Sequence, residues 1–198
     1  MGLEKQAKTL NRNQIEMINT YLGAKRNGIR NQVIFLMSAR AGLRAKEIAN
    51  ITWPMVTDAN GELGDFINLT NIASKGKSGR IIPINKQLKS KLSELYIHEK
   101  SYYRHDISSR IVRTERTDAT SAQAIVNMFQ RWYSDLGLIG CSSHSGRRTF
   151  ITNAAKKIST VGGSLRDVQF LAGHTSLQTT QRYIEGDSEA RMKVVDLI

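Results

Sequence analysis

Residues 53–84 constrain the fold most, because there a strand pattern interrupts a chain whose apolar residues otherwise recur at helical spacing. Asn60-Gly61 is a strong turn dipeptide. Residues 67–70 alternate between apolar and polar side chains, and a second apolar stretch follows at residues 81–84. The block therefore predicts a small three-stranded antiparallel sheet inside a mainly helical α+β domain.

Helical patterns lie on both sides of this block. Asn11 can cap a first helix that ends near Gly23, and a second helix should run from about residue 27 to residue 41 and stop at Gly42. Further helices are expected over residues 86–99 and 121–136, near residue 144, after Ser164 with Asp167 completing a capping box, and after Thr175 with Gln178 in the same role.

Composition narrows the partners. The chain has 198 residues, is 40% hydrophobic and carries a formal charge of +12, so it predicts one globular domain attractive to polyanions, with nucleic acid the first partner to consider. A solvated basic surface would explain the charge equally well. The single cysteine favours a reducing, cytoplasmic location, and no apolar run approaches the roughly 18 residues of a membrane span.

Two short segments carry candidate charged residues. Arg44 and Glu47 lie three residues apart at the start of a short helix, which by itself fits a surface ion pair. A glycine-rich turn at residues 75–79 should project Lys75 and Lys77, either as solvated turn lysines or as cations aimed at a phosphate. Neither segment identifies a function alone.

The most informative stretch is residues 144–184. His144 and Arg147 are three residues apart on one helix turn, His174 follows a glycine, and Tyr183 comes nine residues after His174. Taken singly, the histidines fit capping or core positions, and the tyrosine fits a half-buried aromatic. Together these residue types suggest a site that cuts a phosphodiester.

Read in order, the segments AGLRAKEI, SKGKSGRIIPI, HSGRRTF and LAGHTSLQTTQRY resemble the successive motifs of the tyrosine recombinase (phage integrase) family, over about residues 8–185. The resemblance implies that Arg44 and Arg147 clamp the scissile phosphate, and that Tyr183 is the nucleophile. It assigns Lys75 to the hairpin lysine, His144 and His174 to the two histidines, and Glu47 to the acid that supports the first motif.

Physical chemistry supports such a set. Two guanidiniums offer planar donors that are always charged, so they can take the part that a metal plays elsewhere, and no cofactor, metal or ATP is expected. A phenol with a pKa of about 10 needs a nearby base, for which His144 is the candidate, while His174 helps to orient the phosphate. Lys75 is the candidate acid for the leaving 5′ oxygen. The resemblance implies a 3′-phosphotyrosyl intermediate.

Some positions depart from the family pattern. Arg148 stands where a second histidine is common, and Gly146 where leucine is frequent, so packing beneath that helix should differ. Lys77 lies close enough to Lys75 to be an alternative to it. There is almost no room for the N-terminal DNA-binding domain of most members, so the chain is either a catalytic fragment or a short member that grips DNA from one side.

The expected organisation has three parts. Residues 1–10 form a flexible N-terminal segment, residues 11–186 the catalytic domain, and residues 187–198 a tail helix. The tail either folds back on its own core or, as the resemblance suggests, docks on a neighbour in a DNA-bound tetramer. Expected partners are double-stranded DNA, further copies of the chain and an accessory DNA-bending protein.

Two other functions compete with site-specific recombination. A type IB topoisomerase would use the same chemistry to relax supercoils without exchanging partners. A non-catalytic DNA-binding regulator with the same fold would bind DNA and form no covalent adduct.

Overall fold

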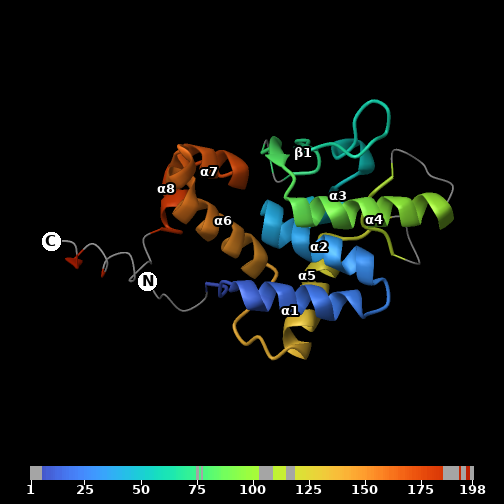
Figure 1. Cartoon of the computed structure of the whole chain (residues 1–198), viewed down its shortest axis with the longest axis horizontal. Helices are drawn as coiled ribbons and strands as arrows, with labels where there is room; N and C mark the ends of the chain where they lie inside the picture. Colours follow the sequence, from blue (N-terminus) through green and yellow to red (C-terminus); the bar gives the residue numbers. More distant parts are fainter. Residues whose placement is uncertain are drawn as a thin grey trace.

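The computed structural model describes residues 6–74, 76, 78–102, 109–114, 119–184, 192, 195 and 196. These residues form the predicted, mainly helical α+β fold, with a small sheet beside one end of the helices (Figure 1). The helix α2 (Gly28–Ala41) lies at the centre and packs against α1 (Arg12–Gly23), α4 (Lys86–Tyr102) and α6 (Ser145–Lys157). Because neighbours cover α2 on several sides, nearly all of its residues from 31 to 41 are buried.

Local signals in the sequence set the ends of the first helices. Asn11 and Gln14 form a reciprocal capping box at the start of α1. Gly42, with φ of 66°, ends α2 in the left-handed conformation that glycine adopts without steric cost. Both predicted boundaries are confirmed.

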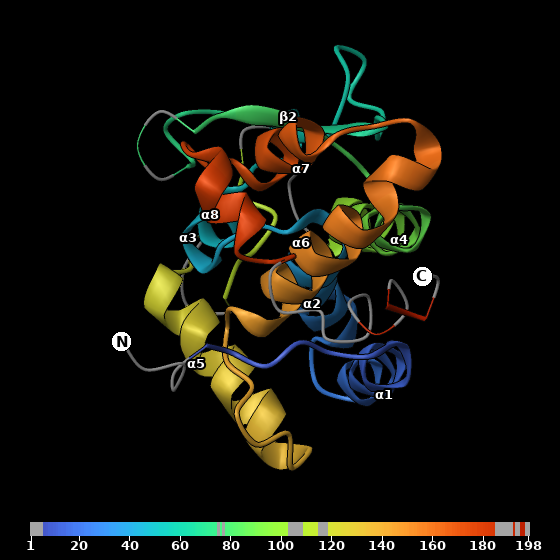
Figure 2. The same cartoon turned by 90° about the vertical axis from the view of Figure 1, so that its left-hand side faces the viewer.

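A second group of helices completes the domain. The short α3 (Ala45–Asn50) packs against α5 (Ala122–Asp135), which Ser121 caps as predicted. α7 (Leu165–Ala172) and α8 (Leu177–Gln181) lie with α6 on one side of the molecule, where α7 also contacts the sheet (Figure 2). Two 3-10 turns complete the described elements, η1 (Trp53–Met55) and η2 (Ile158–Val161).

The sheet has two strands in the described part of the chain, so the prediction of three was wrong. β1 (Phe66–Leu69) pairs antiparallel with β2 (Arg80–Pro83), and Ile67 lies opposite Ile82 on the buried face. Ahead of β1, Thr57 and Leu63 form only an isolated bridge. A tight turn separates Thr57 from Leu63, and the 3-10 turn η1 precedes Thr57. The extended segment between these turns is therefore too short for a third strand.

The cap of α7 was predicted correctly and that of α8 was not. Ser164 and Asp167 form the expected capping box on α7. The N-cap of α8 is Ser176 rather than Thr175, and Ser176 makes no side-chain capping bond. α8 has only five residues, and it packs against α7.

The N-terminal segment joins the fold earlier than expected. The Lys8 amide donates to the Gly140 carbonyl (3.0 Å), and the amide of the buried Leu10 donates to the Thr149 hydroxyl (2.7 Å). Residues 8–10 are therefore held against the start of α6, whereas residues 1–5 lie outside the described part. Of the expected tail, only residues 192, 195 and 196 are described.

Gly146 explains the departure from the family pattern at the start of α6. A Cβ atom there would lie 2.6 Å from the Ser38 hydroxyl oxygen and 3.2 Å from the Ala39 amide nitrogen of α2. A leucine would therefore push the two helices apart. No helix in the described ranges is both long and apolar enough to cross a membrane.

Candidate active site

The first part of the site is the turn between α2 and α3. Arg44 is the N-cap of α3, and Glu47 one turn later accepts hydrogen bonds from the Arg44 amide (2.8 Å) and from its Nη1 (2.8 Å). The side chain of Glu47 is fully buried, whereas that of Arg44 is 24% exposed. Because the carboxylate is enclosed, the interpretation of this pair as a surface ion pair is wrong.

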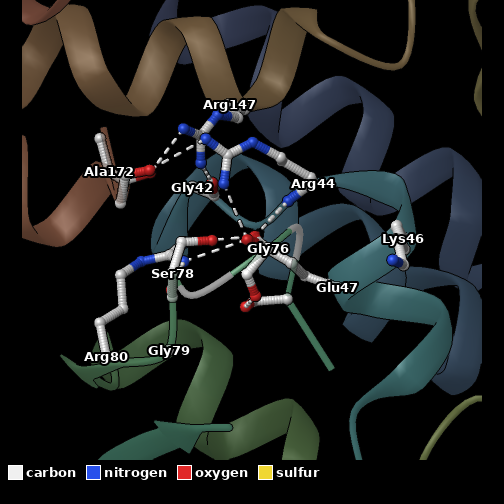
Figure 3. Close-up of polar contacts among 12 residues, drawn as sticks. Gly42, Arg44, Lys46, Glu47, Gly76, Ser78, Gly79, Arg80, Arg147 and Ala172 are labelled. Atoms are coloured by element: carbon white, nitrogen blue, oxygen red, sulfur yellow. Dashed lines mark hydrogen bonds and ion pairs between the residues drawn. The ribbon is translucent and has the colours of Figure 1, made fainter. Parts of the chain in front are cut away.

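Arg147 extends from the first turn of α6 to the same place. Its Nη1 donates to the Gly42 carbonyl at the end of α2, and its Nη2 donates to the Ala172 carbonyl at the end of α7 (2.6 Å). Nη2 of Arg44 donates to the next carbonyl, that of Gly173 (3.2 Å). Figure 3 shows the two guanidiniums together at this turn. Carbonyls at helix C-termini favour cations, so the backbone itself assembles the pair.

The site carries net positive charge, which favours the binding of an anion. Burial, followed by repulsion from Arg44, lowers the pKa of Arg147 to about 9, so the guanidinium stays charged at neutral pH. Burial alone would raise the pKa of Glu47, but hydrogen bonds and charge from Arg80, then from Arg44, hold it below its usual value. One carboxylate therefore faces three arginines, which leaves net positive charge for a phosphate.

His174 and Tyr183 lie on the other side of this turn. Gly173 ends α7 with φ of 59°, and Nδ1 of His174 is 2.9 Å from the hydroxyl of the buried Thr180 on α8. Burial, together with the charge of Arg147, lowers the pKa of His174 to about 4, so its ring is neutral at physiological pH. The ring stacks on that of Tyr183, with centroids 5.7 Å apart and planes at 23°.

A cleft of about 340 Å³ opens beside these residues. His144, the exposed N-cap of α6, lines it together with Arg147 and Tyr183. Arg44 and His174 do not line it: His174 stacks on the lining residue Tyr183, and Arg44 donates to the carbonyl of Gly173, the residue before His174. The other lining residues in the described part of the chain carry no carboxylate: Gln6, Ala7, Ser142, Arg148, Thr179 and Arg182.

The structure thus brings five of the expected site residues around one turn and buries Glu47 beneath them. Lys75 and its alternative Lys77 lie outside the described residues. The base of their hairpin is described, because Arg80 begins β2. Within the described ranges, no group of three or more His, Cys, Asp or Glu side chains is gathered so as to hold a metal ion.

Comparison of the sequence with models of known protein families identifies the family of this chain. The sequence model of the phage integrase family matches residues 8–189. The chain belongs to the phage integrase family. That match includes every expected site residue, from the turn that holds Arg44 to Tyr183.

The sequence identity between this chain and individual members of the phage integrase family is low. The chain is 30% identical over 179 residues to tyrosine recombinase XerC of Syntrophus aciditrophicus, covering 85% of this chain and 53% of that protein. It is 30% identical over 160 residues to tyrosine recombinase XerA of Pyrococcus horikoshii, with 79% and 50% covered. The chain therefore spans about half the length of the curated relatives it matches.

Solved structures share the fold. The crystal structure of XerA recombinase superposes with a TM-score of 0.76 at 20% identity, covering 99% of this chain and 66% of that one. The Tn1549 transposon integrase in complex with transposon right end DNA gives 0.74 at 16% identity, with 98% and 67% covered. At these identities the likeness establishes the architecture alone.

One residue of the site was missed in the sequence. Arg80 donates from Nη1 and Nη2 to the two carboxylate oxygens of Glu47 (3.0 and 3.2 Å), and its side chain is 1% exposed. The signal was the two-residue period of β2, because Arg80 shares its inward face with Ile82. An arginine at an inward strand position needs a buried partner, and Glu47 is that partner.

Proposed function

We propose that this chain is the catalytic part of a site-specific DNA recombinase that breaks and rejoins strands through Tyr183. The observation that carries the proposal is the convergence of Arg147, His144 and Tyr183 on one cationic cleft, with Arg44 and His174 against them. A phosphodiester placed there would meet a nucleophile and donors for its nonbridging oxygens together.

In the proposed first step, the Tyr183 oxygen attacks the scissile phosphorus while His144 accepts the phenolic proton. Arg44 and Arg147 stabilise the negative charge that develops on the nonbridging oxygens. His174, neutral at physiological pH, can donate one hydrogen bond to such an oxygen. These cations would do the work that a metal does in other nucleases, so neither a metal nor ATP is needed.

The bond that breaks joins phosphorus to the 5′ oxygen of the leaving strand. Lys75, by its place in the family pattern, gives a proton to that oxygen, since an alkoxide leaves poorly. The product is a 3′-phosphotyrosyl link and a free 5′ hydroxyl. Attack of a 5′ hydroxyl on the link reverses each proton transfer and rejoins the DNA without an external energy source.

Duplex DNA is the proposed substrate. The +12 charge supports this, as does the solved structure of XerH site-specific recombinase bound to difH substrate, which shares the fold. Assembly into a tetramer, docking of the tail on a neighbour and an accessory DNA-bending protein stay predictions.

The test traps the covalent intermediate on a duplex nicked next to the cleavage position, so that the cleaved fragment diffuses away and religation fails. Wild-type protein should form an adduct that survives denaturation, and Tyr183→Phe should form none while still binding DNA. Tyr133→Phe is the matched control, because the buried Tyr133 hydroxyl has no hydrogen-bond partner among the described residues and its loss should leave folding and cleavage intact.

The same substrates separate the competing functions. A non-catalytic DNA-binding regulator would bind the nicked duplex and give no adduct. A type IB topoisomerase would give the adduct and relax supercoiled plasmid but would not join one duplex to another. Adduct formation with strand exchange supports recombination.

A further inference from the structure

Arg80, like Arg44, is not among the residues that line the cleft. Its guanidinium makes four hydrogen bonds, two to Glu47, one from Nη1 to the Ser78 carbonyl (3.1 Å) and one from Nε to the Leu171 carbonyl (2.8 Å). With its side chain 1% exposed, it has no access to a phosphate on the surface. Any part it plays in catalysis must therefore act through its partners.

Those partners belong to three separate segments of the site. Ser78 lies at the base of the hairpin, Glu47 lies on α3, and Leu171 lies in the last turn of α7, just ahead of His174. Figure 3 shows Arg80 reaching from the strand below toward Glu47 and the turn above. One side chain thus links the hairpin, the first arginine's helix and the turn that carries His174.

The approach of Arg80 to the α7 turn depends on Gly173. A Cβ atom at Gly173 would lie 2.7 Å from Nη1 of Arg80, and the left-handed backbone there also favours glycine. The glycine before His174 therefore leaves space for the Arg80 guanidinium as well as ending the helix. The two residues form one packed unit.

Glu47 transmits the position of Arg80 to Arg44. Both of its oxygens are fixed by Arg80, and the same oxygens accept from the Arg44 amide and from its Nη1. Without Arg80, this buried carboxylate would keep a single charged partner. Arg44 would then be drawn inward to neutralise Glu47 rather than held toward an incoming phosphate.

We propose that Arg80 is a positioning residue for the cleavage reaction: it locks Glu47, and through Glu47 it holds the Arg44 guanidinium in place for the scissile phosphate. This inference rests on the proposed function of the site. Stability alone accounts poorly for the residue, because buried Arg–Glu pairs can often be replaced by apolar residues at no cost.

The experiment compares single-turnover adduct formation on the nicked duplex for Arg80→Gln, Arg80→Lys, Glu47→Gln and the double variant Arg80→Gln/Glu47→Gln. Arg113→Gln is the matched control, since Arg113 pairs with the mostly buried Glu99 (3.6 Å) and donates to the Arg110 carbonyl and the Ser109 hydroxyl. Misplacement of a group by about 1 Å costs about 100-fold in rate, so Arg80→Gln should lose about that factor. Arg80→Lys should recover little, because an ammonium cannot span both carboxylate oxygens.

Two further readouts separate positioning from a general loss of structure. Because Arg80 acts through Glu47, adding Glu47→Gln to Arg80→Gln should cost little more than the first change. On a duplex whose scissile phosphate is a neutral methylphosphonate, the deficit of Arg80→Gln relative to wild type should shrink by at least about tenfold, since there is less charge for Arg44 to stabilise. DNA affinity should change little in either case.

Equal rates for Arg80→Gln and Arg113→Gln would overturn the inference, as would additive losses in the double variant or an undiminished deficit on the neutral substrate. If Arg80→Gln shows no cooperative thermal melt, Arg80→Lys carries the comparison. If wild type itself forms no adduct, the proposed function fails. Arg80 is then tested by thermal unfolding with and without inorganic phosphate. Phosphate should raise the melting temperature of the wild-type protein but not that of Arg80→Lys. An equal rise in both proteins would overturn the inference.

Discussion

At the scale of single residues, the site is built on burial of cations against backbone carbonyls. Arg147 donates to carbonyls at the ends of α2 and α7, and His174 sits behind it as a neutral ring. The single carboxylate of Glu47 does not neutralise the three arginines around it. Burial, followed by the charge of these arginines, lowers the pKa of His174.

His174 should make stability depend on pH in the acidic range. Its pKa is lowered from 6.5 to about 4 in the folded protein. Between these pH values His174 is therefore protonated in the unfolded chain and neutral in the folded chain. The free energy of unfolding should therefore fall as pH drops from about 6.5 toward 4. Urea denaturation across this range measures it.

The same titration has a matched control. His174→Asn should flatten the pH dependence in that window, because it removes the group whose pKa is lowered. An identical slope in the wild-type protein and His174→Asn would contradict the assignment of a buried, neutral imidazole.

At the scale of elements, the contact between α2 and α6 sets where Arg147 lies. Gly146 lets the two helices approach so closely that a Cβ atom would sit 2.6 Å from the Ser38 hydroxyl oxygen. That hydroxyl is buried and, within the described ranges, accepts or donates no hydrogen bond, so its place beside Gly146 is explained by close packing. Because Arg147 follows Gly146 directly, separation of these helices should move the Arg147 guanidinium.

Gly146→Ala should therefore destabilise the protein although alanine is the better helix former. We expect a loss of about 1–3 kcal/mol from overpacking, exceeding the gain of up to about 1 kcal/mol in helix propensity. Combining it with Ser38→Gly removes the clashing hydroxyl and should recover part of the loss. Chemical denaturation measures both; a stabilised Gly146→Ala would show that the helices are not in tight contact.

At the scale of the whole molecule, the cleft and its exposed arginines should govern DNA affinity. Among the described residues no carboxylate lines the cleft, and the exposed Arg182 lines it next to Tyr183. If Arg182 contacts one phosphate, Arg182→Gln should reduce the slope of log affinity against log salt by about 0.9. Titrations from low to moderate salt give the slope.

Lys25 supplies the control for this measurement, since it lies over the Tyr21 ring beyond the end of α1. Lys25→Gln should lower affinity little and leave the slope within error of wild type. Equal effects of the two substitutions would indicate diffuse attraction rather than contacts at the cleft.

The sequence predicted those parts of the molecule that depend on neighbouring residues. Caps such as Asn11 and stops such as Gly42 act within a few positions, so they were readable. The burial of Glu47 was not, because it depends on Arg80, which lies 33 residues away. The order of the motifs along the chain predicted the site residues through the family resemblance. Which of their side chains pair with one another could be found only from the three-dimensional structure.

Errors followed from the same limit. A third strand was expected because turn signals and apolar residues were present, yet whether such residues pair depends on the space that a neighbouring turn leaves. The segment before Asn11 looked polar and free, but Leu10 is buried and its amide bonds to Thr149 on α6. Polar composition does not reveal a contact 139 residues away.

The central claim is that Tyr183 becomes joined to DNA, and mass spectrometry of the trapped adduct tests it most directly. After nuclease and protease digestion, the account predicts one modified peptide, containing Tyr183, with a nucleotide attached through its 3′ phosphate to the phenolic oxygen. A nucleotide on any other side chain, or no covalent link from a protein that binds and cleaves the duplex, would contradict it.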